Sequence, residues 1–142
     1  MMKNKLVTIM VIILVSITLV GVLAVVAITK FNGNGEKKDP SIEEIVKSSV
    51  DIPEITTNLG SGDFIKMSFT IQTDSTDAKK ELEQRIFQVK NIIITELSDM
   101  KPEALKGKAG KIKFEEQLKT KVNALMKEGH IVQVYITSSI LQ

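Results

Sequence analysis

The hydrophobic positions of the chain follow three patterns in turn, and the first is a long apolar run. Between Leu6 and Ile28 no residue is charged, and only Thr8, Ser16 and Thr18 have polar side chains. As a helix these about 23 residues span roughly 34 Å, which is enough to cross a hydrocarbon core of about 30 Å. In lipid the backbone must hydrogen-bond to itself, so the run predicts one continuous transmembrane helix.

A cleaved signal peptide is the competing interpretation of this run. Lys3 and Lys5 would form its basic region, and Val25-Val26-Ala27 is a tolerable cleavage site. The apolar core of a signal peptide usually holds only about 7–15 residues, so the length of the run favours an uncleaved anchor. Lysines flank both sides. The short tail before a long C-terminal region nevertheless favours a cytoplasmic N-terminus and an extracytoplasmic C-terminal domain.

The stretch after the apolar run is polar and rich in turn-forming residues. Two Asn-Gly pairs and a Pro lie within residues 31–40, which predicts a flexible linker without a core of its own. Ser41 followed by Glu44 fits a capping box that opens a short helix. One face of this helix carries three apolar residues, Ile42, Ile45 and Val46. A helix this short is unstable alone. It therefore either frays or docks onto a partner.

The second pattern has a period of two and predicts a β-hairpin. Four apolar residues alternate with polar ones, namely Ile65, Met67, Phe69 and Ile71. This alternation is typical of a strand with one buried face. The segment Val50–Ile55 also has the composition of a strand, and Pro53 restricts it to a sheet edge or a strand start. The turn residues Gly60–Asp63 join the two strands.

The third pattern has the period of a helix and begins after Asp74. Apolar residues at spacings of four and three predict one helix of about six turns that packs on the sheet. Its stripe consists of Leu82, Ile86, Val89, Ile93 and Leu97. The N-cap is expected among Ser75, Thr76 and Asp77.

Two further elements are predicted before the chain ends. A short turn of helix follows Met100, with Pro102 in its first turn. A second helix is expected from about Lys111 to Glu128, with Gly129 as its C-cap. Its buried residues are expected to be Ile112, Leu118, Val122 and Leu125. The segment Ile131–Ile136 is rich in β-formers and predicts a closing strand.

These elements together predict an α+β fold. A single N-terminal transmembrane helix precedes a small β-β-α-α-β domain whose last strand returns to the sheet. The expected boundaries are a cytoplasmic tail at residues 1–5, the transmembrane helix at 6–28, a linker with the short helix at 29–49, and an extracytoplasmic domain at 50–142.

The composition excludes most kinds of catalytic and metal-binding site. The 142 residues contain no Cys and a single His, so disulfides, thiolate or multi-His metal sites and a Cys nucleophile are excluded within this sequence. A formal net charge of +2 provides no general basic field for nucleic acid. His130 has no acid or nucleophile close in sequence, which favours a structural or surface role. The sequence therefore predicts no enzyme, no cofactor and no nucleic-acid partner.

Charge is nonetheless distributed unevenly. Residues 36–99 contain 13 acids and 8 bases, whereas residues 101–127 contain 8 lysines and 3 glutamates. Halves of opposite sign suit contact between identical copies, the alternative being that both are simply solvated faces. We expect partner or self-assembly contacts at six residues, Ile42, Ile45, Val46, Lys106, Lys108 and Lys111.

The second half of the chain also resembles a known family. Asn91–Ser98 matches a helix that ends in Ile-Ile-x-x-Leu-Ser, and the closing helix and strand are similar to those of the same family. The similar positions are Glu115, Leu118, Val122, Asn123, Leu125, Ile131–Thr137 and Gln142. The family is that of the flagellar basal body-associated FliL proteins. Lys90-Asn91 stands where Arg-Asp is expected, and Ser138-Ser139 replaces a bulkier strand end.

The resemblance implies a stomatin/prohibitin-like domain that assembles into a ring outside the cell membrane. In that family the ring surrounds or abuts the ion-driven stator of the flagellar motor and supports torque, swimming or swarming without catalysis. The implied partners are flagellar stator subunits, further copies of the chain and the lipid bilayer. The alternative is an anchored or secreted protein that binds anionic cell-wall polymer through the lysines of residues 101–127.

Overall fold

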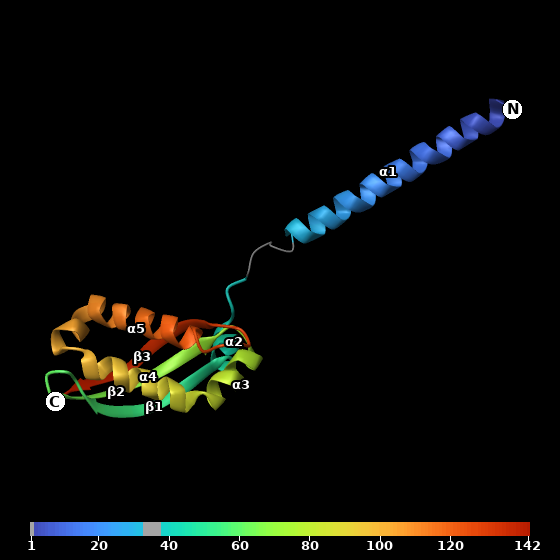
Figure 1. Ribbon diagram of the computed structural model, residues 1–142. Helices are drawn as coiled ribbons and strands as arrows, with labels where there is room; N and C mark the ends of the chain where they lie inside the picture. Colours follow the sequence, from blue (N-terminus) through green and yellow to red (C-terminus); the bar gives the residue numbers. More distant parts are fainter. Residues whose placement is uncertain (1, 33–37) are drawn as a thin grey trace. The chain divides into compact units, whose positions relative to one another are not determined.

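A computed structural model describes residues 2–32 and 38–142 of the chain (Figure 1). It contains two compact units, Met1–Asp39 and Pro40–Gln142, each of which is described by itself. Residues 33–37, a part of the predicted linker that includes most of its two Asn-Gly pairs, lie outside the described residues. We call residues 40–142 the head.

The first unit is the helix α1 (Met2–Asn32), which extends beyond both ends of the predicted span. Its stretch Asn4–Lys30 has a mean hydropathy of 3.1 and is long and apolar enough to cross a membrane. The hydroxyls of Thr8, Ser16 and Thr18 each donate to the carbonyl four residues earlier, at 2.7–2.8 Å. Each polar side chain of the predicted span therefore has a partner within the helix itself, as a lipid environment requires.

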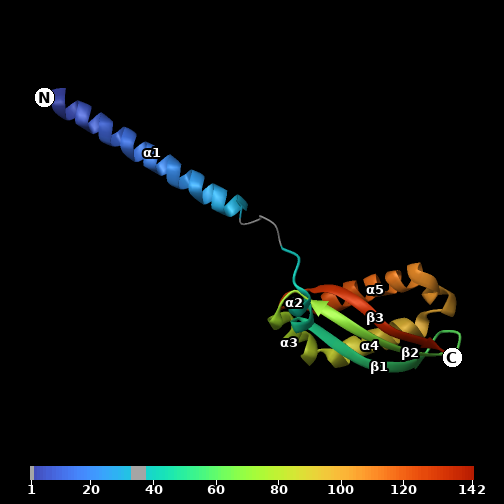
Figure 2. The ribbon, with the colours of Figure 1, turned by 180° about the vertical axis from the view of Figure 1, so that it is seen from behind.

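The head is a mixed helix and sheet structure built on three antiparallel strands. β1 (Ser49–Asn58), β2 (Phe64–Thr73) and β3 (Ile131–Leu141) lie in the order β1-β2-β3. The helices pack on one face of this sheet, and Figure 2, seen from behind, shows the strands in front of them. The predicted alternation in the second strand is confirmed, because its four apolar residues Ile65, Met67, Phe69 and Ile71 are all buried.

The core lies between the sheet and the helices. The ring of Phe69 in β2 meets the ring of Phe114 edge to face, with centroids 6.2 Å apart. Burying aromatic pairs of this kind removes a large apolar area from water and adds about 0.5–1.5 kcal/mol beyond that burial. The remaining helix residues of the core include Leu82, Val89, Ile93, Leu97, Leu118 and Val122.

The strand β1 lies at one edge of the sheet, which is one of the two positions that Pro53 allows. Pro53 and Glu54 together oppose a single residue of β2, so the pairing register shifts between Ile52 and Ile55. A bulge with a proline is a common way to blunt a sheet edge, because it removes a backbone donor and interrupts the row of free groups.

The single helix predicted after Asp74 is wrong, because the structure divides it into α3 (Thr76–Gln84) and α4 (Ile86–Asp99). Arg85 has φ −98° and ψ 8°, and its N–H donates to the carbonyls of both Glu81 and Leu82. The apolar stripe continues across the break, since Leu82, Val89, Ile93 and Leu97 are all buried. Ser75 is the N-cap of α3 and accepts a hydrogen bond from the N–H of Ala78.

The second predicted helix is displaced toward the N-terminus. The 3₁₀ helix η1 (Pro102–Leu105) begins with the proline, and α5 (Gly107–Asn123) follows it directly. The expected C-cap at Gly129 is wrong, because α5 ends six residues earlier and Gly129, with φ +84°, belongs to the turn before β3. Ile112 is also not buried as expected, being 45% exposed, and Phe114 takes that place in the core.

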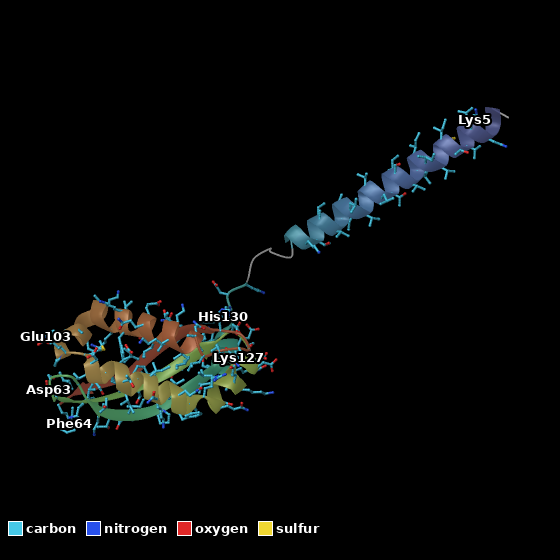
Figure 3. All side chains as sticks on the ribbon, in the orientation of Figure 1. Lys5, Asp63, Phe64, Glu103, Lys127 and His130 are labelled. Carbon is cyan, nitrogen blue, oxygen red and sulfur yellow. The ribbon has the colours of Figure 1, made fainter. Side chains whose placement is uncertain are left out.

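The head has two opposite ends. Figure 3 places Asp63, Phe64 and Glu103 at one end, which we call the hairpin end. Lys127 and His130 lie at the opposite end, which we call the turn end. The helix α2 (Ile42–Lys47) lies at the turn end (Figure 1).

Candidate functional site

The helix α2 presents two of its three candidate contact residues to solvent. The predicted capping box is confirmed, since the Ser41 hydroxyl accepts from the N–H of Glu44 and the Glu44 carboxylate accepts from the N–H of Ser41. Ile42 is 71% exposed and Val46 is 63% exposed, whereas Ile45 is half-buried. This apolar pair is therefore on the surface of the head and not part of its core.

The three candidate lysines lie at the hairpin end, around the start of α5. Lys106 and Lys108 are exposed, and Lys111 is half-buried with its Nζ 3.4 Å from the carbonyl oxygen of Leu105, to which it donates. η1, which carries Glu103, leads into this segment at the end of the head opposite α2 (Figures 1 and 3). The structure therefore does not bring the apolar and the basic candidates together in one site.

A carboxylate, Glu81, holds the turn that follows α5. Its oxygens accept from the backbone N–H groups of Lys127 at 3.0 Å and Glu128 at 2.6 Å, and from Arg85 Nε at 2.8 Å. These bonds stabilise the ionised form, so the pKa of Glu81 lies below its ordinary value of 4.5. The largest cause is the bond from the Glu128 N–H, and partial burial acts in the opposite direction.

A second carboxylate, Asp74, holds the last residue of the same turn. Its oxygens lie 3.1 Å from the His130 N–H and 2.9 Å from His130 Nδ1. A Cβ at Gly129 would collide with this carboxylate and with Ala78, so only glycine fits there. His130 therefore has a structural partner 56 residues away in sequence, which the sequence pattern does not reveal.

A polar cleft of about 900 Å³ lies between α4, η1 and α5. Its charged lining is mixed and consists of Glu96, Asp99, Lys101, Glu103 and Lys113. Lys121 of α5 pairs with Glu96 of α4 beside it. Within the described residues no three His, Cys, Asp or Glu side chains are grouped as a metal site requires. The cleft brings together no nucleophile and base of the kind that covalent catalysis uses.

Along the first half of β3, side chains bond to several outward backbone groups of the strand. The side chain of Asn123 accepts from the N–H of Ile131 at 2.7 Å and donates to its carbonyl at 3.3 Å. Gln133 Nε2 donates to the carbonyl of Val134, and Glu115 Oε1 accepts from the N–H of Ile136 at 2.9 Å. Side chains thus bond to four backbone groups along this half, the N–H and C=O of Ile131, the C=O of Val134 and the N–H of Ile136.

Comparison with known proteins gives two agreeing results. Residues 49–142 match the sequence model of a family described as "Flagellar basal body-associated protein FliL". The chain is also 44% identical over 124 residues to the "Flagellar protein FliL" of Bacillus subtilis (strain 168), covering 86% of this chain and 89% of that protein. The matched region begins at the first residue of β1 and includes the whole sheet and all the helices that pack on it.

Proposed function

The chain belongs to the FliL family of flagellar basal body-associated proteins, and on that premise we propose that it is a membrane-anchored accessory of the flagellar motor. It oligomerises beside the stator and supports rotation of the flagellum in swimming or swarming. Members of this family are flagellar accessory proteins and not enzymes. The observation that carries the proposal is the join of a family domain at residues 49–142 to an apolar helix long enough to span a membrane.

The anchor determines where such a head can act. With residues 1–5 in the cytoplasm and residues 6–28 in the bilayer, the head lies outside the membrane. The nine residues between Asn32 and Ile42 then join the anchor to the head as a tether. Nine residues span at most about 30–32 Å, which keeps the head close to the membrane and to any transmembrane partner.

The orientation of the anchor has a direct test in the absence of native cysteines. A single cysteine at an exposed head position, Thr120→Cys, should react with a membrane-impermeant maleimide on intact cells. Asn4→Cys, on the other side of the predicted span, should react only after the cells are opened. Mature protein in the culture fluid that lacks the first two dozen or so residues would instead identify a signal peptide.

The motor role is tested by deletion. A clean deletion should impair swimming or swarming while flagellar filaments still form in substantial number, because an accessory of rotation is not needed to build the filament. Expression of the full chain from a plasmid should restore motility, and expression of residues 38–142 behind a cleavable signal peptide should not, because the anchor is missing. Normal swimming and swarming in the deletion strain would contradict the proposal.

The mixed charge of the head supports contact between copies over binding to a single-sign polymer. Lys121 already pairs with Glu96, and Lys111 already donates to the Leu105 carbonyl. These contacts leave Lys106 and Lys108 as the more accessible pair of candidate lysines at the hairpin end. Self-association is therefore the interaction that the charges of the head favour.

A further inference from the structure

The second half of β3 differs from the first in having edge groups without side-chain partners. Phe64 and Gln142 exchange both backbone bonds across β2 and β3, at 3.0 and 2.8 Å. Bonded and non-bonded pairs alternate along an antiparallel ladder, so Ser139 and Leu141 direct their N–H and C=O groups away from the sheet. Within residues 38–142 no side chain bonds to these groups, unlike those of Ile131 and Ile136.

The opposite edge of the sheet, strand β1, carries a matching row of outward backbone N–H and C=O groups. The N–H of Phe64 is used by β3, so its pair with Asn58 on the other side is a non-bonded pair. By the same alternation Asn58 and Thr56 direct their backbone groups away from the sheet. Both side chains are exposed, and both residues lie beyond the bulge at Pro53.

The two rows are at equal height in the head and run in the same direction. Thr56 of β1 and Ile140 of β3 are both paired with Lys66 of β2, and Asn58 and Gln142 are both paired with Phe64. In a parallel ladder each residue bonds to the two residues flanking the one opposite it. Thr56 placed beside Ile140 of another copy would therefore bond to Ser139 and Leu141, the residues whose groups point outward.

We propose that copies of this chain associate side by side through this match, with the second half of β3 pairing in parallel with β1 (residues 55–58) of the next copy. This inference rests on the proposed function in taking the partner to be another copy, and it names the surface that the copies use. The contact joins two different surfaces, so it repeats from copy to copy and closes into a ring where the rotation permits.

The helix layer has apolar residues on both flanks of the same contact. On α5, Glu115 reaches the outer edge of β3, and Ile112 lies one turn away on that side of the helix and is 45% exposed. On α4, Glu96 faces α5, and the opposite side of the helix, over β1, carries Ile94 and Phe87, which are 40% and 71% exposed. Side-by-side copies bring Ile112 of one against Ile94 of the next.

The membrane anchor favours this arrangement over a symmetric dimer. Rotation about an axis along the strands keeps every α2, and therefore every tether, on one side of the assembly. Antiparallel pairing of two β3 strands would instead place the two tethers at opposite ends of strands about 33 Å long. The helix α1 ends at Asn32, so the nine residues between it and Ile42 reach at most about 30–32 Å, which is less than that length if the strands stand along the membrane normal.

Oxidative crosslinking of the full-length chain in membranes tests the contact. Thr56→Cys and Ile140→Cys in one chain would lie about 5 Å apart between copies, within the range of a disulfide. Within one copy they are separated by β2, at about twice that distance, which a disulfide cannot bridge. The chain contains no other cysteine. The matched control is Ser49→Cys with Ile140→Cys, which uses the same two strands at a different height.

The expected result is a ladder of covalent dimers, trimers and larger species from the Thr56/Ile140 pair, and only monomer from the control pair and from each single variant. Dimers from Ile140→Cys alone would show antiparallel pairing and overturn the inference. Monomer from the Thr56/Ile140 pair would also overturn it. If a deletion strain loses motility while this pair gives no ladder, the contact is wrong and the motor role stands. A ladder together with normal motility in the deletion strain would show the reverse.

Discussion

The two halves of β3 lie on one edge of the same sheet but differ in how that edge is completed. Over residues 131–136 the side chains of Asn123, Gln133 and Glu115 bond to the outward backbone groups. Over residues 137–141 no such side chain is found in the head, and Ile140 and Leu141 are about half exposed. The head itself provides partners for four backbone groups of the first half and for none of the second half, which is suited to pairing with another chain.

The sequence of β3 lacks the features that usually protect an edge strand. Edge strands of monomeric proteins are commonly protected by a charge, a proline or a bulge that twists the edge away. β1 has Pro53 and a bulge, together with Asp51 and Glu54. The eleven residues of β3 contain no charge and no proline. The pairing of β3 with β2 shifts its register between Ser68 and Phe69 of β2, and this shift separates the two halves of β3. Beyond it the last residues of β3 pair regularly, and no bulge protects their outer edge.

The largest effect on stability is expected at Asn123, because this one side chain hydrogen-bonds to both the N–H and the C=O of Ile131. Asn123→Ala would leave the N–H and C=O of the fully buried Ile131 without partners, which should cost about 2–4 kcal/mol of unfolding free energy. Urea unfolding of the detergent-solubilised chain, followed by fluorescence of Tyr135, the single Tyr, measures it. Asn123→Asp keeps the acceptor and should lie between the two, and equal stability of all three would contradict the role of Asn123.

A smaller and pH-dependent effect is expected at the turn that leads into β3. The pKa of Glu81 is lowered in the folded chain, so its contribution to stability is present above the unfolded pKa and is lost as pH falls through the folded pKa. The stability difference between the natural chain and Glu81→Gln should therefore be largest near neutral pH and vanish well below about pH 4. Unfolding curves at several pH values measure it, with Glu83→Gln, exposed on the same helix, as the control. A difference that grows toward acid pH would contradict the assignment.

The third effect concerns the N–H of Ile136, the last backbone group in the first half of β3 that has a side-chain partner. Glu115→Ala removes the acceptor of the Ile136 N–H and should cost about 1 kcal/mol. Glu115→Gln keeps a neutral acceptor and should restore most of the loss, which separates the hydrogen bond from the charge. The same unfolding measurement applies, and equal losses in both variants would indicate that the charge of Glu115 matters instead of its bond to β3.

The parts of the fold that the sequence predicts are those with local causes. The apolar run, the capping box at Ser41, the alternation in β2 and the edge position imposed by Pro53 each depend on residues close together in the chain. All four are present in the structure. Hydrophobic periodicity and cap chemistry are signals that a single sequence carries in full.

The parts that the sequence does not predict have distant causes. The α3–α4 break at Arg85 contains no Gly or Pro, and α5 ends at Asn123 where its side chain bonds to Ile131 across the turn. Glu81 reaches Glu128, 47 residues away. Ile112 is a different case, because it lies six residues before Leu118 and so off the buried helix face, whereas Phe114 lies four residues before Leu118 and on it.

The candidate contact residues also differ in whether residue types close in sequence reveal them. Ile42 and Val46 are exposed as a docking face requires. The outward backbone groups of Ser139 and Leu141 belong to no side-chain pattern, so a reading of residue types misses them. A charge-free stretch at the end of β3 is the only sequence signal that indicates this edge.

The smallest effect on folding, and the sharpest test of the contrast within β3, is expected from Leu141→Lys. Leu141 is 52% exposed near the end of the strand, so a lysine there should change the unfolding free energy by no more than about 0.5 kcal/mol. A charge on an open edge opposes pairing with another strand, because the strand that pairs there must desolvate it. Sedimentation of the detergent-solubilised chain should therefore show loss of the associated species in this variant.

The matched control adds the same charge elsewhere, because net charge alone also weakens association. Thr120→Lys lies on the exposed side of α5, away from both edges of the sheet, and should leave association unchanged. Equal loss of association in the two variants would assign the effect to net charge, and persistence of association in Leu141→Lys would place the contact elsewhere. Loss in Leu141→Lys alone, at unchanged stability, would mean that the second half of β3 serves assembly and contributes little to the folding of the head.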